Sequence, residues 1–402
     1  MSFRFHFGRP QRIAALILLF FFAETVFLAG RAPLNEADYR YALCGREMWE
    51  KPAPLAGYFT TCGNMQGDGS LAYRAAGLPL TVYIAGLRIG DWVGAKFGGT
   101  SGVGDADALG GSVYDLRHQI TGTRYLLRMP FAFAAVGLGA GLWWVSRRLF
   151  GNTAGAFALG LYCVSPAVLR AATTPNNEIL AAWGLFAVVY TAIGIGHAMY
   201  GPARKWRPRI VLFTVALGFT ACAHILAAIL GLLFSAALLL YVAERRRTAV
   251  LPLLLVSAFG ALLIVYASYT FRLGIFTYVF TAGAARFILS AMPAQELFTD
   301  PLQLAVTAAC GIALLLFVLV RRSRYFGNTA PLLVALALLP VVTTQVRTAP
   351  VMWALPFLLT FAAGVFADVI ETAQRKLFLA IMATTWLAQA ALCVEFLLSP
   401  AA

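Results

Sequence analysis

Carboxylates gather in one short polar stretch of an otherwise apolar chain, Leu34–Glu50 (LNEADYRYALCGREMWE). Its acidic residues are Glu36, Asp38, Glu47 and Glu50, out of 17 aspartates and glutamates in 402 residues. A carboxylate held within hydrogen-bond reach of a hydroxyl or an amine can take its proton, so this stretch could supply a general base. The competing interpretation is a solvated interfacial helix, because Tyr41, Cys44 and Met48 recur at the spacing of one helix face.

The composition places this stretch in a membrane protein. Hydrophobic residues make up 60% of the chain and charged residues 12%, with a mean hydropathy of +0.78. These values lie outside the range of a soluble globular domain. The net charge of +14 comes from short basic clusters between apolar runs, where they act as topology signals, so we exclude a nucleic-acid-binding protein. Ile13–Gly30 is too long for a signal peptide and has no small-residue cleavage site, so we interpret it as a retained anchor.

Apolar runs of about 20 residues predict the transmembrane helices. They are Ile13–Gly30, Tyr125–Val145, Thr153–Leu169, Ile179–Met199, Val250–Phe271, Leu302–Val320, Leu332–Val346, Met352–Val369 and Leu377–Leu397. Ile210–Tyr241 is too long for one crossing, and basic clusters at both of its ends predict a hairpin that turns near His224. Leu78–Phe97 contains Arg88 and Asp91, and a crossing there would separate the N-terminal arginines from all later basic clusters. We therefore expect it to lie along the membrane surface.

The predicted fold is an all-α, polytopic membrane protein of about eleven transmembrane helices, with its N-terminus inside and its C-terminus outside. Residues 1–402 are expected to form one membrane domain without a soluble C-terminal domain. The external segments are 31–123, 172–178 and 272–301. Cys44 and Cys62 share the first external loop, where disulfides persist, and a bond or two buried thiols are both open at this point.

The order of residues in the first external loop resembles a known family. An acidic pair at the outer end of the first helix, then a tyrosine and REM, is similar to the "DE…Y…REM" signature of the bacterial protein mannosyltransferase and aminoarabinose transferase superfamily, which has the GT-C fold. RYLLRMPF, RRLFG, a third helix ending in SP, and the loop TTPNNE also resemble the family pattern. The resemblance covers roughly Ala14–Leu185.

The resemblance implies a function and a place. Such proteins transfer a sugar from a polyprenyl-phosphate carrier to a lipid, glycan or protein acceptor on the outer face of the cytoplasmic (inner) membrane. The alternative to an enzyme is a multi-helix transporter or a flippase for lipid-linked sugars. Those folds commonly carry internal repeats, and we find no convincing repeat in this sequence. A noncatalytic membrane subunit is the third interpretation.

The resemblance also implies the residues of the site, although the chain departs from the family pattern. Asn35 and Glu36 stand where the Asp-Glu pair is usual, whereas alignment on REM puts Asp38 and Tyr41 in the key places. Glu36 is therefore the first candidate for the catalytic base and Asp38 the second. The expected substrate-binding residues are Asn35, Tyr39, Arg40, Tyr41, Arg74, Arg128, Asn176, Asn177, Glu178 and Arg347.

Arginine is the expected partner of the donor phosphate, because its planar fork matches phosphate oxygens. Arg347 interrupts the apolar stretch TTQVRTAPVMW, although an arginine there could equally reach up to the lipid headgroups. A divalent cation, Mg²⁺ or Mn²⁺, could bridge Glu36 or Asp38 to the donor phosphate, because Mg²⁺ needs only one or two protein carboxylates. No His and carboxylate spacing in the sequence resembles a dedicated metal site.

Overall fold

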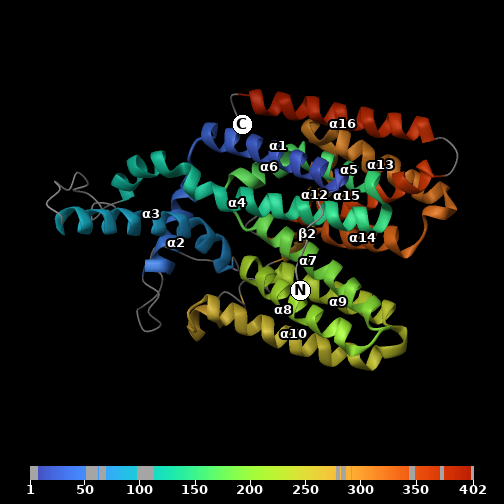
Figure 1. Ribbon diagram of the computed structural model, residues 1–402, viewed down its shortest axis with the longest axis horizontal. Coiled ribbons are helices and arrows are strands. Elements are labelled where there is room, and N and C mark those ends of the chain that lie inside the picture. The colour runs from blue at the N-terminus through green and yellow to red at the C-terminus, as the bar shows by residue number, and fades with distance from the viewer. Residues whose placement is uncertain are drawn as a thin grey trace.

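The structure is a computed structural model that describes residues 8–50, 62, 69–96, 113–277, 281, 287–290, 292–343, 349–371 and 375–399. Long helices packed side by side make up almost all of it (Figure 1). Apolar stretches take this form because a backbone in lipid must satisfy its own hydrogen bonds. The all-α, polytopic fold predicted from the sequence is thus confirmed.

Eight of the described helices are long and apolar enough to cross a membrane. They are α1 (Arg9–Arg31), α4 (Val113–Phe150), α7 (Glu178–Ala198), α9 (Ile225–Val242), α10 (Arg247–Ser268), α13 (Leu304–Leu319), α15 (Ala349–Ile370) and α16 (Arg375–Leu398). The other helices are α2 (Glu36–Glu50), α3 (Ser70–Lys96), α5 (Asn152–Cys163), α6 (Pro166–Thr173), α8 (Ala203–Ala223), α12 (Met292–Thr299) and α14 (Phe326–Leu338). Among the described residues, 3₁₀ turns include η3 (Glu244–Arg246), η4 (Pro301–Gln303) and η5 (Arg321–Ser323). α7 and α15 are the most buried of the eight long helices.

Two irregular points in the helical path have local causes. α8 and α9 meet at His224, which has an extended backbone, so the hairpin predicted near this residue is present. α5 and α6 form a pair bent by 62° in place of one straight helix over Thr153–Leu169. The bend follows from Pro166, whose nitrogen cannot donate to the preceding turn and which instead starts α6. This pair brings the number of candidate crossings to nine.

One predicted crossing is wrong in extent. The apolar run Leu332–Val346 was expected to form a single helix, but α14 ends at Leu338 and β2 (Val341–Thr343) follows it. β2 pairs antiparallel with β1 (Phe287–Leu289), and Ser290 N donates to Pro340 O at 2.8 Å. Pro340 has no N–H for a helical hydrogen bond, which explains why the helix stops here.

Contacts between helix ends show which helices begin or finish at the same end of the bundle. At one end Arg31 Nη1 donates to Leu397 O at 2.9 Å, so α1 and α16 finish together. At the opposite end the Phe150 and Tyr325 rings lie 6.4 Å apart, and the Tyr241 and Phe326 rings lie 5.3 Å apart. A chain whose first and last helices finish at the same end crosses an odd number of times, which fits the nine candidate crossings of the described residues as well as the predicted eleven. Which end faces outward stays a prediction.

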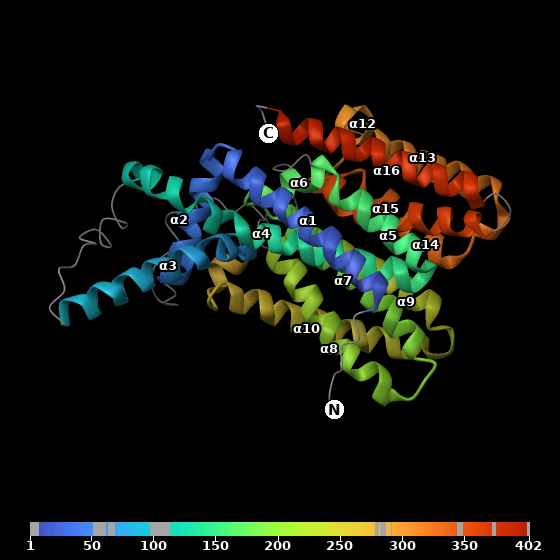
Figure 2. The same ribbon diagram turned by 45° about the horizontal axis from the view of Figure 1, so that its top comes forward.

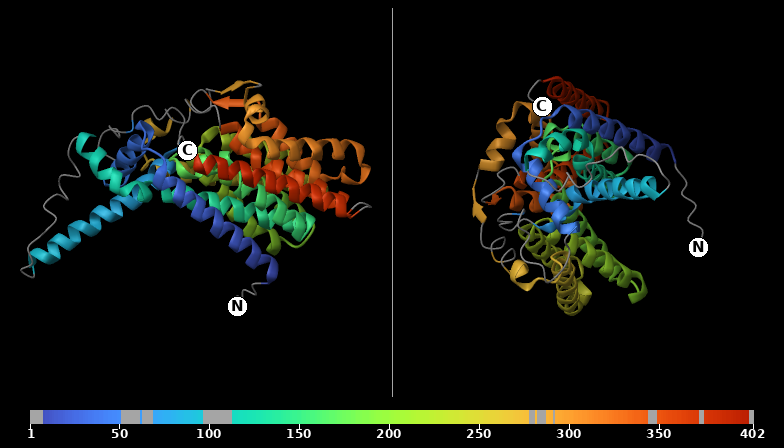
Figure 3. Two further views of the ribbon diagram at one scale, coloured as in Figure 1. Left: turned by 90° about the horizontal axis from the view of Figure 1, so that it is seen from above. Right: turned by 90° about the vertical axis from the view of Figure 1, so that its left-hand side faces the viewer.

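The predicted external loop contains two helices that pack on one another. α2 and α3 approach so closely that a Cβ on Gly45 would lie 2.0 Å from Tyr73 O, so only glycine fits there. The Tyr41 and Tyr73 rings stack with centroids 4.4 Å apart. α3 is one continuous helix that includes the segment Leu78–Lys96 and extends away from the bundle in both rotated views (Figures 2 and 3). Its expected position along the membrane surface stays a prediction.

Cys44 and Cys62 form a disulfide that ties α2 to the segment before α3. Because the bond closes a loop with a sequence separation of 18, its removal should lower the stability of this unit by about 3 kcal/mol. We expect reductant to lower the thermal midpoint of the wild-type chain but to leave that of a Cys44→Ser, Cys62→Ser double variant unchanged. Alkylation of both thiols without reductant would contradict the bond.

Candidate active site

The first turn of α2 is fixed by a reciprocal pair of hydrogen bonds. Asn35 Oδ1 accepts from Asp38 N, and Asp38 Oδ2 accepts from Asn35 N, each at 2.9 Å. Such a reciprocal cap satisfies backbone donors that have no partner inside the helix. The acidic stretch therefore begins as a rigid helix start, and Asn35 is occupied by it.

Asp38 also pairs with Arg128 of α4. The Asp38 Oδ2 to Arg128 Nη2 distance is 2.9 Å, and each side chain is 1% exposed. The Arg128 guanidinium further donates to Ala29 O at 2.9 Å, Ala32 O at 2.8 Å and Pro33 O at 2.9 Å. Arg128 thus holds the end of α1, the connection that follows it and the start of α2 in one place, which leaves neither member of the ion pair facing solvent.

Glu36 differs from Asp38 in its exposure and in its partners. It is the first residue of α2 and is exposed, and the described residues offer its carboxylate neither an ion pair nor a hydrogen bond. Arg40 follows four residues later and is also exposed, so both side chains lie on one face of α2. The structure therefore places an exposed carboxylate and an exposed guanidinium on one face of α2, and the Arg40 guanidinium lies 6.0 Å from the centre of the Tyr41 ring.

Three other predicted residues near α2 take part in packing. Tyr41 is buried against Tyr73, and Tyr39 is half-buried against the hydrophobic core. Arg74 of α3 donates from Nε at 3.0 Å and from Nη2 at 2.7 Å to Ser268 O, the last residue of α10. Burial lowers the pKa of the Arg74 guanidinium below its ordinary value. These contacts join the α2–α3 unit to the bundle.

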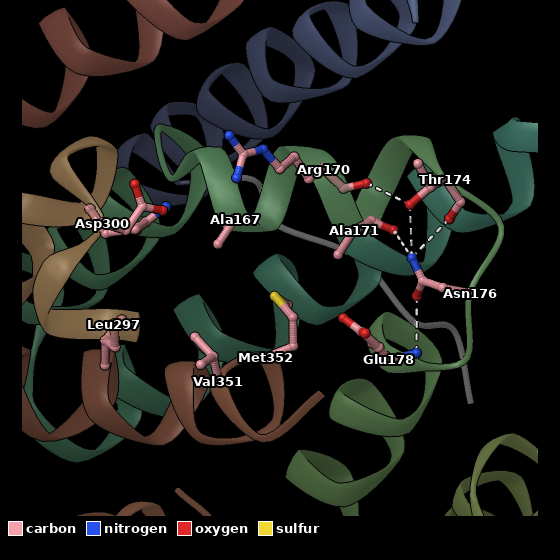
Figure 4. A pocket seen from close by; sticks show the side chains of 11 residues that line it. Ala167, Arg170, Ala171, Thr174, Asn176, Glu178, Leu297, Asp300, Val351 and Met352 are labelled. Atoms are coloured by element: carbon pink, nitrogen blue, oxygen red, sulfur yellow. Dashed lines mark hydrogen bonds between the residues drawn. The ribbon is translucent and has the colours of Figure 1, made fainter. Parts of the chain in front are cut away.

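The loop between α6 and α7 carries the second group of predicted residues. Asn176 Nδ2 donates to Ala171 O at 3.0 Å and Thr174 O at 2.9 Å, while its Oδ1 accepts from Glu178 N at 2.9 Å (Figure 4). Asn176 therefore caps α7 with its side chain. Asn177 is buried, and neither polar atom of its amide has a hydrogen-bond partner among the described residues.

A cavity of about 250 Å³ opens beside this loop. It lies between α6, the start of α7, the segment from α12 to η4, and the first turns of α15 (Figure 4). Its lining residues are Ala167, Arg170, Ala171, Thr174, Asn176, Glu178, Leu297, Asp300, Gln303, Val351 and Met352. Figure 4 shows the Glu178 carboxylate near Met352 of α15. Arg170 lies in the upper part of this view and Asp300 at its left.

The cavity and the start of α2 belong to the same end of the bundle. The Arg170 guanidinium lies 4.9 Å from the centre of the Phe396 ring, near the end of α16, and Arg31 at the end of α1 contacts Leu397. The structure thus brings Glu36, Arg40, Asn176 and Glu178 to one end. Arg347 lies outside the described residues.

Outside the TTPNNE loop, sequence reasoning missed three polar residues of the cavity, which are Arg170, Asp300 and Gln303. Arg170 follows the SP pair at the bend between α5 and α6, and Asp300 precedes Pro301 at the start of η4. Gln303 is a lone amide at the start of a long apolar run. A search for polar residues next to helix breaks would have found all three.

Metal-binding groups do not converge in the described part of the chain. No cluster of three or more His, Cys, Asp or Glu side chains that could hold an ion is found there. Asp38 Oδ2 is already shared between Arg128 and Asn35 N, so Asp38 and Glu36 do not form a paired carboxylate site. The described residues thus offer the exposed Glu36 carboxylate and no cluster of ligands, and a cation that bridges this carboxylate to the donor phosphate stays a prediction.

Comparison with solved structures gives close fold similarity at low sequence identity. The structure of ArnT from Cupriavidus metallidurans in the apo state matches with a TM-score of 0.62 and 13% identity over 97% of this chain and 75% of that one. The same protein bound to undecaprenyl phosphate gives 0.61 and 14% over 97% and 76%. An oligosaccharyltransferase from Archaeoglobus fulgidus, in complex with zinc and sulfate, gives 0.52 and 14% over 95% and 53%. No family model and no curated protein matches the sequence.

Proposed function

We propose that this GT-C fold chain is a membrane glycosyltransferase that moves a sugar from a polyprenyl-phosphate carrier to a lipid, glycan or protein acceptor. The observation that carries the proposal is the similarity of 97% of the chain to a solved structure that holds undecaprenyl phosphate. A fold can host several functions, so the assignment also rests on the residues at one end of the bundle.

The side chains at this end match the demands of glycosyl transfer. The acceptor hydroxyl or amine must lose a proton, and Glu36 is an exposed carboxylate in a fixed helix start. The carrier phosphate leaves with the electron pair of the broken bond, and Arg40 offers a guanidinium on the same helix face to receive it. Asp38 is already committed to Arg128, so we assign it the role of positioning α2.

The proposed step keeps atoms and charges in balance. Glu36 takes the acceptor proton as the acceptor oxygen or nitrogen bonds to the anomeric carbon of the sugar. The bond between that carbon and the phosphate oxygen breaks, and polyprenyl phosphate departs beside Arg40. Both carboxylate and guanidinium must therefore face the same space, as their spacing on α2 permits.

The same end of the bundle is proposed to face outward, across the cytoplasmic membrane from the basic end. Arg147 and Arg148 end α4 near Phe150, and Arg322 pairs with Glu371 at the same end, which agrees with the excess of positive charge on inner loops. The disulfide between Cys44 and Cys62 lies at the other end, and disulfides are typical of the oxidising side of a membrane.

The direct test supplies the purified, reconstituted full chain with undecaprenyl-phosphate-linked glucose, mannose and arabinose. We expect release of undecaprenyl phosphate from at least one donor when a suitable lipid, glycan or protein fraction is added. A chain that discharges none of the donors, but moves them between the leaflets of vesicles, would be a flippase and would overturn the proposal.

A further inference from the structure

Among the described residues, one polar group of the cavity between α6, η4 and α15 has no hydrogen-bond partner. Gln303 is 2% exposed and lines the cavity, and its Oε1 accepts from Ser165 Oγ at 3.0 Å. Its Nε2 is buried and has no hydrogen-bond partner among the described residues. A buried amide without a partner has lost its hydration without compensation, so a ligand atom that accepts a hydrogen bond from it binds more tightly than it would to an exposed amide.

Gln303 is held rigidly enough to recognise a ligand. Gln303 N donates to Asp300 O at 3.0 Å, and the Asp300 carboxylate accepts from Leu302 N at 3.0 Å. On α16, Gln389 Nε2 donates to Leu302 O at 2.8 Å and its Oε1 accepts from Val306 N at 3.2 Å. The backbone on both sides of Gln303 is therefore fixed by α16, and a fixed donor is more selective than a mobile one.

The charges of the cavity indicate the class of ligand. Its charged side chains are Arg170, Glu178 and Asp300, so carboxyl groups outnumber guanidinium groups. Such a lining disfavours a phosphate and suits a neutral group with several hydroxyls, which can both donate to carboxylates and accept from Nε2. The volume of about 250 Å³ is below the roughly 300–1,000 Å³ of sites for drug-sized ligands, so it fits one ring and excludes a polyprenyl chain.

We propose that this cavity binds a single sugar ring and that Gln303, through Nε2, is the residue that selects which ring is accepted. The inference rests on the proposed function, which it deepens by naming the place and the determinant of sugar recognition. Met352 and Val351 form the apolar side of the cavity, against which the carbon face of a ring packs. The ring can belong to the donor or to a glycan acceptor, because both present the same hydroxyl chemistry.

The variant that tests the inference is Gln303→Met, which keeps the length of the side chain and removes its amide. The control is Asn328→Leu, because Asn328 is equally buried, its Nδ2 donates to Ser323 O at 3.0 Å and to Asp368 Oδ2 at 2.7 Å, and it lies at the opposite end of the bundle. We expect the control to lower the thermal midpoint of the chain without changing its preference among sugars. Gln303→Met should change that preference.

Two measurements keep the inference separate from the proposed function. The first measures the binding of free glucose, mannose and arabinose to the full chain. Saturation-transfer NMR detects the binding, and inorganic phosphate is added as a competitor. We expect binding by the wild type and by Asn328→Leu, a roughly 10-fold weaker affinity for Gln303→Met, and no competition from phosphate. Equal binding by all three chains, absence of binding, or displacement by phosphate would overturn the inference whatever the chain transfers.

The second measurement is transfer itself, with donors or glycan acceptors that lack one ring hydroxyl at a time. For each hydroxyl, the measured quantity is kcat/KM with the parent sugar divided by kcat/KM with the analogue that lacks this hydroxyl. For one hydroxyl, this ratio should be roughly 10-fold larger in the wild type than in Gln303→Met. An effect in the donor series places the donor sugar in the cavity, and an effect in the acceptor series places the acceptor there. If neither ratio changes although transfer proceeds, the inference fails and the proposed function stands. If binding depends on Gln303 but the wild type transfers nothing, only the proposed function fails.

Discussion

Replacement of Glu36 by glutamine is expected to lower turnover by on the order of 10²-fold or more, while the protein stays folded and binds its donor. Glutamine keeps the size of the side chain and its hydrogen-bonding oxygen but cannot take the acceptor proton. Because Glu36 is exposed and makes no described contact, its loss should leave the thermal midpoint unchanged. The measurement is the rate of donor discharge, with donor binding and thermal unfolding recorded on the same preparation.

Glu50→Gln is the matched control for this prediction. Glu50 lies at the other end of the same helix, where its Oε1 pairs with Arg46 Nε at 2.8 Å, and it should keep the parental rate. A larger loss of turnover in Asp38→Asn than in Glu36→Gln, at equal protein stability, would transfer the role of base to Asp38. Parental rates in both variants would leave α2 as an interfacial helix with surface charges.

Features that depend on neighbouring residues were predicted from the sequence. The spacing of Tyr41, Cys44 and Met48 indicated a helix with one covered face, and all three are buried in α2. The charges on both sides of Ile210–Tyr241 indicated a hairpin, and the chain does turn at His224. Periodicity and charge are local properties, so one sequence is enough to read them.

Features that depend on distant residues were not predicted. Hydropathy could not show that Leu332–Val346 leaves its helix, because the partner of β2 is β1, which comes much earlier in the chain. Arg128 was chosen as a phosphate ligand by its residue type, yet its partner Asp38 is 90 positions away. Likewise, the hydrogen-bond partner of Gln303 Oε1 is Ser165, which lies 138 positions away. Residue type therefore identified candidates, and tertiary contacts decided which of them are available.

The ion pair between Asp38 and Arg128 leads to the second large effect. Arg128→Ala should destabilise the protein by about 3–5 kcal/mol, because it leaves the Asp38 carboxylate buried without a cation. It also removes the donors to Ala29 O, Ala32 O and Pro33 O, so the start of α2 should loosen. Activity would then fall through a misplaced Glu36, even though neither member of the pair meets the substrate.

Two further variants show whether the loss of stability in Arg128→Ala comes from the burial of the ion pair. Arg322→Ala removes an equivalent ion pair, 3.2 Å from Glu371, in which the side chains are 60% and 65% exposed, so it should change stability by at most about 1 kcal/mol. The double variant Asp38→Asn, Arg128→Met removes both buried charges together, and it should be more stable than the sum of the two single losses predicts. Thermal unfolding of Arg128→Ala, Arg322→Ala, the double variant and its two single variants, Asp38→Asn and Arg128→Met, in one detergent gives this comparison. Equal, small shifts for Arg128→Ala and Arg322→Ala would show that the buried pair does not hold α2 to α4.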